Sequence, residues 1–393
     1  MYKVNEQIAE EIEKDSRTFR LYAVSTDGQI YFDPERIFSA NSQRQSTSKS
    51  DDIELGAICS EQWETEIYSL NDDILGRRFK IFIYLADRNF SGITYGNLKK
   101  YTCGFLKNLT VNQAKNLGSI MGDPIPMGEY TCVKVNRNAE SSTVTFADRL
   151  YFSDKKYVPK IAFPASFSEV ENDICNQLGL KNGCTYPYSK RLKENGGNWL
   201  DAKGKVHLKT KSFYFEIENL PAENVTMRQM LSYIASAMGQ CGYINREGEY
   251  VRTWYGSDVD YILDKNRIDT PTLGSANVIK ELKCKIDDST TLSVTNVRIT
   301  DGRTIEFENP LMTEELMNLL YSSLTENSWL TDWQTAEINL RLGDPRLDIM
   351  DTCIYGGNRM PVTSLAFSYD GGLSAAIKSA GKNSAEEIII EKE

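Results

Sequence analysis

The stretch "CGYINREGEYVRTWY", residues 241–255, directly follows an amphipathic segment, "TMRQMLSYIASAMG" (226–239). That segment opens with Thr226 and Gln229 in the spacing of a capping box, so a helix is predicted to start there. Downstream, residues 245–248 (Asn-Arg-Glu-Gly) fit a type I turn, which favours Asn first and Gly fourth. The pattern therefore predicts a compact α+β unit in which a helix packs on a small hairpin.

The glycines and apolar residues set the limits of this helix–hairpin unit. Gly239 or Gly242 ends the helix, because glycine readily adopts the left-handed conformation that stops one. A strand then begins at Tyr243 and Ile244, and residues 250–252 form the second strand of the hairpin. The helix has a methionine-rich face, which is more typical of core packing than of a partner-binding groove: Met227, Met230, Leu231, Ile234 and Met238.

A second helix is predicted within "SFSEVENDICNQLGLKNG" (166–183). Ser168 and Glu171 have the capping-box spacing, and Gly179 supplies a left-handed stop. One helical face is apolar: Phe167, Val170, Ile174 and Leu178.

The chain before this unit has a β pattern, so the first 155 or so residues are predicted to be all-β. Asp27-Gly28 lies between two alternating runs in residues 19–37, a strong hairpin signal. Residues 39–52, "SANSQRQSTSKSDD", have no hydrophobic periodicity and predict a mobile loop. Further strands are predicted at 80–86, at 101–111 and as a pair within 128–151.

A β pattern returns after residue 275, with strands predicted in 278–288, 292–299 and 304–309. Asp301-Gly302 predicts that the last two form a hairpin. A third helix follows, capped by Thr313, with a buried face of leucines: Leu316, Leu319, Leu320 and Leu324. The end of the chain predicts a strand with a Gly-Gly break and then a charged tail.

These patterns predict a β-rich α+β, multidomain fold. The predicted division is an N-terminal β domain (1–156), an α+β domain (157–256), a second β domain with one helix (257–384) and a tail (385–393). A chain of 393 residues is too long for one compact core, which also favours several domains.

The bulk composition limits the function classes. Hydrophobic residues make up 40% and charged residues 25%, as in ordinary globular proteins. A net charge of −10 disfavours sequence-independent binding of duplex DNA and suits a surface that DNA passes without sticking. No apolar run is long enough for a transmembrane helix, and the polar N-terminus lacks a signal peptide core, so synthesis in the cytoplasm is expected.

The sequence predicts no catalytic residue, no cofactor site and no metal site. The single histidine, His207, lies among alternating lysines in "KGKVHLKTK" (203–211), the pattern of a solvated strand. No two of the eight cysteines have C-x-x-C spacing, so reduced, mostly buried thiols are expected. Residues 46–49 match S-x-x-K by chance in a Ser-rich loop, and no P-loop is present.

Acidic pairs and tryptophans are alternative candidates for a site. Adjacent acids point to opposite faces of a strand, so surface turns are the favoured reading of Asp51-Asp52, Asp72-Asp73 and Asp287-Asp288. Asp258 and Asp260 lack the glycine of a calcium-binding EF-hand loop. Five scattered tryptophans could stack on sugars but are more typical of core or interface positions: Trp63, Trp199, Trp254, Trp329 and Trp333.

Three stretches together resemble the tail hub proteins of tailed bacteriophages. "GQCGYINREGEYVRTWY" resembles their helix–hairpin, "FENPLMTEELMNLLYSSL" the opening of a later helix, and "RLGDPRLDIMDTCIY…MPVTSLAFSYDGGLSAAIKSAG" their ending. The segment "KSDDIELGAICSEQWETEI" is a looser match. Met350 departs from the pattern, because the family usually has Gly before the position of Asp351. The chain stops at Glu393 without the fibre or peptidoglycan-cleaving domain of many relatives, so hydrolysis is not implied.

The resemblance implies a structural protein rather than an enzyme. Members of the tail hub family form trimeric rings at the tail tip, with two β-barrel-like domains in each subunit. Such a ring joins the sixfold tail tube to a threefold tip. Expected neighbours are a distal tail protein or tail tube ring, the tape measure protein and a tail fibre or receptor-binding protein. DNA would pass through the channel without specific binding, and the chain would not enter the membrane. The particle would be assembled in the bacterial host cytoplasm.

Two other functions stay open at this point, a tail-associated peptidoglycan hydrolase and a cell-surface carbohydrate-binding protein. The loop 39–52 and the tail 385–393 are candidate partner-binding segments, since "EEIIIEKE" could add a strand to the edge of a partner's sheet.

Overall fold

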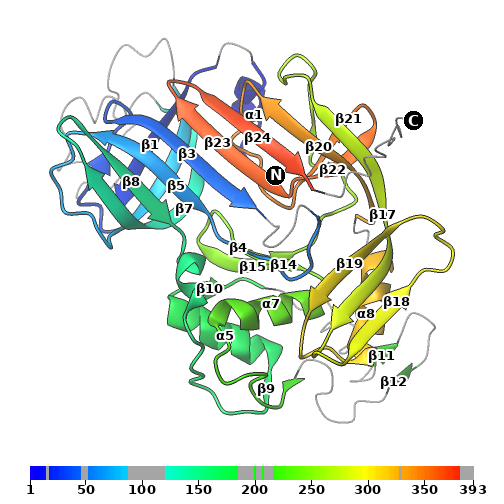
Figure 1. Ribbon diagram of the computed structural model, residues 1–393. Coiled ribbons are helices and arrows are strands. Elements are labelled where there is room, and N and C mark those ends of the chain that lie inside the picture. The colour runs from blue at the N-terminus through cyan, green and yellow to red at the C-terminus, as the bar shows by residue number, and fades with distance from the viewer. Residues whose placement is uncertain are drawn as a thin grey trace, which may run out of the picture.

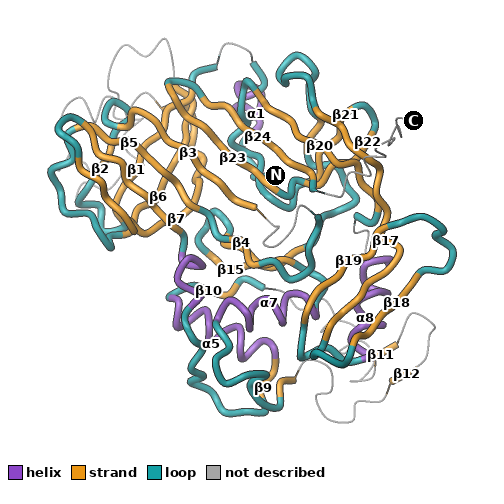
Figure 2. Tube along the Cα trace, in the orientation of Figure 1, coloured by secondary structure: helices purple, strands orange, loops and turns teal. Residues whose placement is uncertain are grey.

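The structure is a computed structural model that describes residues 1–14, 17–45, 52–86, 120–184, 199–200, 206–207, 216–326 and 330–380. Broad strands form the upper part of the molecule in Figure 1, and most of the helices lie below them (Figure 2). The described structure is β-rich, as the sequence predicts.

The N-terminal part of the chain supplies half of a large sheet: β1 (Phe19–Ser25), β2 (Tyr31–Phe32), β3 (Ile37–Gln45), β5 (Gln62–Tyr68), β6 (Arg78–Ala86), β7 (Ile120–Arg137) and β8 (Ser141–Ala147). The Asp27-Gly28 hairpin is confirmed, with Val24 opposite Tyr31 and Gly28 at a φ of 69°. The strand at 80–86 and the strand pair within 128–151 are also confirmed. Residues 101–111 lie outside the described residues.

The C-terminal part supplies the other half: β17 (Thr272–Lys285), β18 (Thr291–Thr295), β19 (Arg303–Glu308), β20 (Asp332–Leu340), β23 (Ser364–Asp370) and β24 (Leu373–Ser379). The halves join where β3 pairs with β23, with Ala40 opposite Tyr369. These thirteen strands form one sheet, in the order β18-β17-β20-β24-β23-β3-β5-β8-β7-β6-β1-β2 with β19 beside β17 (Figure 1).

The mobile loop predicted over 39–52 is wrong for residues 39–45, which belong to β3 in the middle of this sheet. Alternate residues of β3 are buried, but two of them, Ser42 and Arg44, are polar. Ser42 Oγ accepts a hydrogen bond from the Phe367 backbone at 3.3 Å, and Arg44 forms ion pairs. Burial therefore alternates along β3, but a hydrophobicity pattern does not reveal it because two of the buried residues are polar. Residues 46–51 lie outside the described residues.

The all-β prediction for the N-terminal part is also incomplete. A helix, α1 (Glu6–Ile12), starts at the cap Asn5, and a 3₁₀ helix, η1 (Arg149–Asp154), follows β8. Ile8 and Ile12, one helical turn apart, are the buried residues of α1. Two apolar residues in a highly charged segment gave too weak a period to be recognised.

The helix–hairpin unit is confirmed. The helix α7 (Met227–Ala237) carries the Thr226–Gln229 capping box, and it packs on β14 (Cys241–Ile244), which pairs with β15 (Glu249–Thr253). Gly239, at a φ of 71°, follows the helix end, whereas Gly242 lies inside β14. This small sheet is completed by parallel pairing with β10 (Lys181–Asn182) and β4 (Ile58–Cys59).

The second helix, α5 (Phe167–Leu178), is confirmed, and Gly179 stops it at a φ of 68°. Its capping box is Ser166 with Glu169, not the predicted Ser168 with Glu171. Both pairs have the required spacing, so spacing alone could not choose between them. Glu171 is fully buried and cannot serve as a surface cap.

The hairpin predicted at Asp301-Gly302 is wrong. β18 pairs antiparallel with β17, while β19 pairs parallel with it, and Cys284 faces both Leu292 and Phe307. The two short strands therefore flank β17 on opposite sides. Gly302 is needed for close approach, because a Cβ there would lie 2.7 Å from Lys280 Cβ.

The third helix, α8 (Glu314–Glu326), begins after Thr313, whose hydroxyl accepts from the Leu316 N–H, and its leucine face is buried. The Gly-Gly break is a turn between β23 and β24, with Gly371 at a φ of 66°. The remaining strands form three small sheets: β16 (Tyr261–Ile262) with β21 (Thr352–Tyr355) and β22 (Asn358–Pro361), β11 (Trp199–Leu200) with β12 (Val206–His207), and β9 (Ala165–Ser166) with β13 (Glu216–Ile217).

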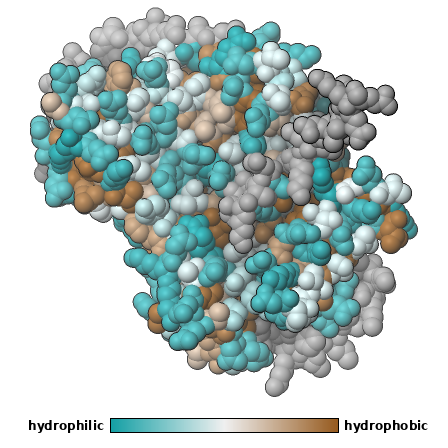
Figure 3. All heavy atoms as spheres, in the orientation of Figure 1, coloured by the Kyte–Doolittle hydropathy of each residue, from teal (hydrophilic) through white to brown (hydrophobic). Residues whose placement is uncertain are grey.

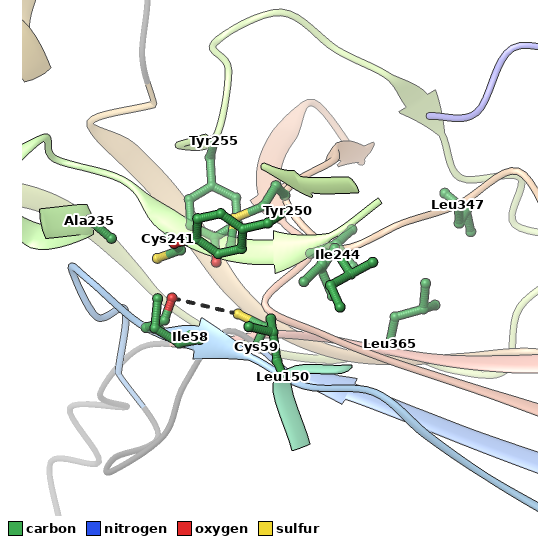
Figure 4. Close-up of a cluster of buried hydrophobic side chains, with 14 of the residues drawn as sticks. Ile58, Cys59, Leu150, Ala235, Cys241, Ile244, Tyr250, Tyr255, Leu347 and Leu365 are labelled. Carbon is green, nitrogen blue, oxygen red and sulfur yellow. Dashed lines mark hydrogen bonds between the residues drawn. The ribbon is translucent and has the colours of Figure 1, made fainter. Parts of the chain in front are cut away.

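One continuous hydrophobic core links these parts. Figure 4 shows Cys241, Ile244 and Tyr250 of the hairpin gathered with Ile58 and Leu365 of the flanking segments. Because that core and the large sheet both cross the predicted boundaries, the four-part division stays a prediction.

Candidate functional site: a buried charge cluster

Five polar residues from distant parts of the chain meet in the interior. This junction cluster consists of Arg44 on β3, Glu61 before β5, Tyr130 on β7, Arg246 in the hairpin turn and Asp348 in the loop before β21. Arg44 Nη1 donates to Asp348 Oδ1 at 2.8 Å, and Arg44 Nη2 forms an ion pair with Glu61. The Arg44 side chain is 5% exposed, so these charges are removed from water.

Glu61 is held by neutral donors as well. Tyr130 Oη donates to Glu61 Oε2 at 2.6 Å, and Trp63 Nε1 donates to Oε1 at 3.1 Å. Burial raises the pKa of the Glu61 carboxyl, although Arg44 opposes the shift. Because each oxygen of Glu61 already accepts a hydrogen bond inside the fold, the carboxyl group is placed to fix its neighbours rather than to meet a substrate.

Arg246 joins the hairpin turn to the C-terminal loop. Its Nη1 donates to the Pro345 carbonyl at 2.5 Å and its Nη2 to the Leu347 carbonyl at 2.6 Å. Its Nε lies 3.4 Å from Asp348 Oδ2. Burial alone would raise the pKa of Asp348, but Arg44 and Arg246 together lower it. Asp348 is therefore the shared anion of two buried arginines.

The loop that carries Asp348 has a special backbone. Met350 adopts a φ of 69°, the left-handed conformation that glycine tolerates best. Met350 therefore holds a left-handed turn position at which the resembled phrase usually has glycine. Asp344 and Arg346 brace the same loop, with Arg346 Nη2 2.7 Å from Asp344 Oδ2.

A second buried pair joins the helix–hairpin unit to α5. Arg252 of β15 donates from Nη2 to Glu171 of α5 at 3.0 Å and from Nη1 to Gln240 at 2.6 Å. The side chains of Arg252 and Glu171 are both 0% exposed. This pair fixes α5 against the hairpin, and the junction cluster fixes the hairpin against the large sheet.

Sequence reasoning did not find the residues of the junction cluster. Arg44 lies in a stretch interpreted as a loop, and Arg246 occupies a turn position where charged residues are common. The one available signal was a charged residue, Arg44, at a position of β3 that alternates with exposed residues and therefore points inward. That signal can be used only after residues 37–45 have been recognised as a strand.

The candidates named from the sequence do not come together. Asp72, Asp73, Asp287 and Asp288 are exposed, and Asp287 accepts from the backbone of its own turn at Ser289. Asp258 and Asp260 are also exposed. His207 lies in β12 opposite Trp199, and its side chain is outside the described part. Residues 46–51, which hold the S-x-x-K match and Asp51, are outside it as well.

The tryptophans do not form a sugar-stacking surface among the described side chains. Trp63, Trp254 and Trp333 are at most 4% exposed, and each indole N–H donates to a group inside the protein. The side chains of Trp199 and Trp329 lie outside the described part.

The thiols follow the prediction. Seven of the eight cysteines are described, all seven are free and six of them are buried. Within the described ranges, no group of three or more His, Cys, Asp or Glu side chains could hold a metal ion. In the same ranges, no helix is long and apolar enough to cross a bilayer.

The described surface includes two grooves of more than 500 Å³. One, of about 720 Å³, crosses the large sheet and is lined by side chains that include Asn41, Gln43, Glu64 and Asn339. The other, of about 560 Å³, runs between β19 and residues 52–57. Figure 3 shows one face of the molecule, mostly hydrophilic with small hydrophobic patches. Neither groove contains a residue of the junction cluster.

Comparison with solved structures shows which known proteins share this fold. No protein-family model matches the chain, and no curated protein matches its sequence. The 43 kDa tail protein of prophage MuSo2 from Shewanella oneidensis aligns with 92% of this chain and 98% of its own, at 11% identity and a TM-score of 0.51. A tail protein from Neisseria meningitidis MC58 aligns with 93% and 97%, at 8% identity and a TM-score of 0.52.

A third structure, the phage P2 baseplate in its activated conformation, aligns with 93% of the chain but has a TM-score of only 0.28, too low to support an inference. The resemblance predicted from sequence phrases is confirmed at the level of the fold: over nearly its whole length, the chain has the fold of phage tail proteins.

Proposed function

We propose that the chain is a structural hub of a phage or prophage tail, positioned at the tail tip. The observation that carries this proposal is the fold shared with two tail proteins over at least 92% of this chain and 97% of theirs.

In this proposal three copies form a ring that joins the sixfold tail tube to the threefold tip. Residues 1–156 and 257–384 are its two β-barrel-like domains, and the helix–hairpin unit is a spacer packed on the ring. The junction cluster supports the proposal, because ion pairs in the interior that join distant segments suit a subunit that keeps one shape.

The proposed neighbours are a distal tail protein or tail tube ring above, the tape measure protein in the channel and a tail fibre or receptor-binding protein below. The net charge of −10 suits a channel that DNA passes without binding. The chain itself is proposed to have no catalytic activity.

The first test is the mass of the purified protein in solution, with negative-stain images of the same fraction. A threefold ring with a central hole would support the hub. If the chain stays monomeric when mixed with tail tube rings, the hub is contradicted. Cleavage of peptidoglycan, or saturable binding of a cell-wall sugar by the monomer, would favour the hydrolase or the carbohydrate-binding function instead.

A further inference from the structure

The groove between β19 and residues 52–57 has one wall with an open strand edge. β19 pairs with β17 on one side, and among the described strands none pairs with its other side. The opposite wall is a non-helical segment in which Ile53 and Leu55 are buried while Asp52 and Glu54 are half-buried. A strand edge beside a groove of about 560 Å³ is the geometry in which an added strand binds.

The groove is acidic. Of the charged side chains that line it, four are acids and one is a base: Asp52, Glu54, Glu306, Glu308 and Arg303. Glu306 and Glu308 are exposed on the outer face of β19, whereas Ile305 is buried and Phe307 half-buried on the inner face. Lys283 Nζ lies 3.5 Å from Glu306 Oε1, and both side chains of this ion pair are largely exposed, so Glu306 stays accessible from solvent.

One segment of the chain has the complementary pattern. Residues 203–211, "KGKVHLKTK", carry Lys at positions 203, 205, 209 and 211, with no acid, and their intervening positions include Val206 and Leu208. Paired beside β19, such a strand would set lysines against Glu306 and Glu308 on one face and apolar side chains beside Ile305 and Phe307 on the other.

The same segment contains β12, which already has a partner on one side. Val206–His207 pairs with Trp199–Leu200, and among the described strands β12 has no partner at its second edge. The β11–β12 pair lies at the lower right margin of the molecule, beyond the helix α8 (Figure 1). A basic segment and an acidic strand edge on the same chain could form a heterologous pair of surfaces, which generates a ring when the rotation between copies closes.

We propose that the acidic groove beside β19 binds the basic segment 203–211 of a second copy of this chain by strand addition. This inference rests on the proposed assembly of several copies and names one contact between them. Opposite charges steer the segment to the groove, and the backbone of β19 then holds it.

The first experiment measures binding of a labelled peptide, residues 201–213, to the full-length chain with K203E, K205E, K209E and K211E. Those substitutions disable the chain's own segment and leave its groove empty. We expect saturable binding that weakens about tenfold or more when E306K and E308K are added, because like charges then face each other. D72K with D73K, which reverses two exposed acids elsewhere, should leave binding unchanged. A peptide that does not bind, or binds equally to the E306K/E308K chain, overturns the inference.

The second experiment compares the solution mass of the native chain with that of three variants. E306K/E308K and K205E/K209E should each lower the oligomeric state, and their combination should restore it. An oligomer that none of these changes affects keeps the ring but overturns this contact. A native chain that is monomeric, yet whose groove binds the peptide, assigns the groove to the chain's own segment and overturns docking between copies.

Discussion

Arg44 Nη1 lies 2.8 Å from Asp348 Oδ1, although the two residues are 304 positions apart in the sequence. One lies on β3 in the middle of the large sheet, and the other lies in the loop before β21. Arg246 shares Asp348 and brings in the helix–hairpin turn. Three segments that the sequence pattern separates are therefore fixed to one another through a single, partly buried carboxylate.

Substitution of Arg44 by Met should lower the free energy of unfolding by about 3–5 kcal/mol, because Glu61 and Asp348 would be left with too little compensating charge in the interior. The matched control is Arg77→Met, which removes a pair with Asp27 whose side chains are 43% and 47% exposed. That change should cost about 1 kcal/mol or less. Urea unfolding measures both, and equal losses would contradict the role assigned to the junction cluster.

Substitution of Gly56 by Ala should be much more harmful than substitution of Gly76. Both glycines have positive φ, at 82° and 77°. A Cβ at Gly56 would lie 2.7 Å from the Ser232 carbonyl on α7, whereas at Gly76 nothing lies within 4 Å. We expect a loss of about 1 kcal/mol at Gly76 from backbone strain and about 3 kcal/mol at Gly56, where overpacking adds to it. Thermal unfolding of the two variants checks the difference.

The stability contributed by Asp351 should fall as the pH rises from about 4 to 6. Burial raises the pKa of Asp351 from 3.8 to about 6, although the amino group of Met1 opposes the shift. Between those values the folded protein holds a proton that the unfolded chain has released, so raising the pH favours unfolding. The difference in unfolding free energy between native protein and Asp351→Asn should change across this range. A constant difference would show that the carboxyl group titrates normally.

The buried thiols should resist alkylation in the native protein at pH 8. Burial raises the pKa of Cys241 to about 12 and that of Cys132 to about 11, and it also raises the pKa values of Cys59 and Cys353. The thiolate is the reactive form, so little of it exists at that pH. Thiol titration before and after unfolding in guanidinium should show most of the eight cysteines reacting only afterwards. Rapid reaction of four or more in the native state would contradict the burial.

Local signals in the sequence were sufficient where neighbouring residues control the conformation. The Thr226–Gln229 box, the Gly179 stop and the Asp27-Gly28 turn all act within a few residues, and each is where the pattern put it. The methionine-rich face of α7 packs in the core, as its helical spacing favoured. The resemblance in short phrases also led to the right fold.

Tertiary structure alone decided which distant segments pair. Strand 39–45 was hidden because Ser42 and Arg44 are buried polar residues whose partners, Phe367 and Asp348, come from the other end of the chain. The Asp301-Gly302 signal was misread because β17 offers two edges, and no local rule says which one a strand joins. The sequence by itself determined the helices α5, α7 and α8, the cap of α7 and the turn at Asp27-Gly28, since these depend on backbone geometry within a few residues. The large sheet and its buried charges depend on partners hundreds of residues away, which only the folded chain brings together.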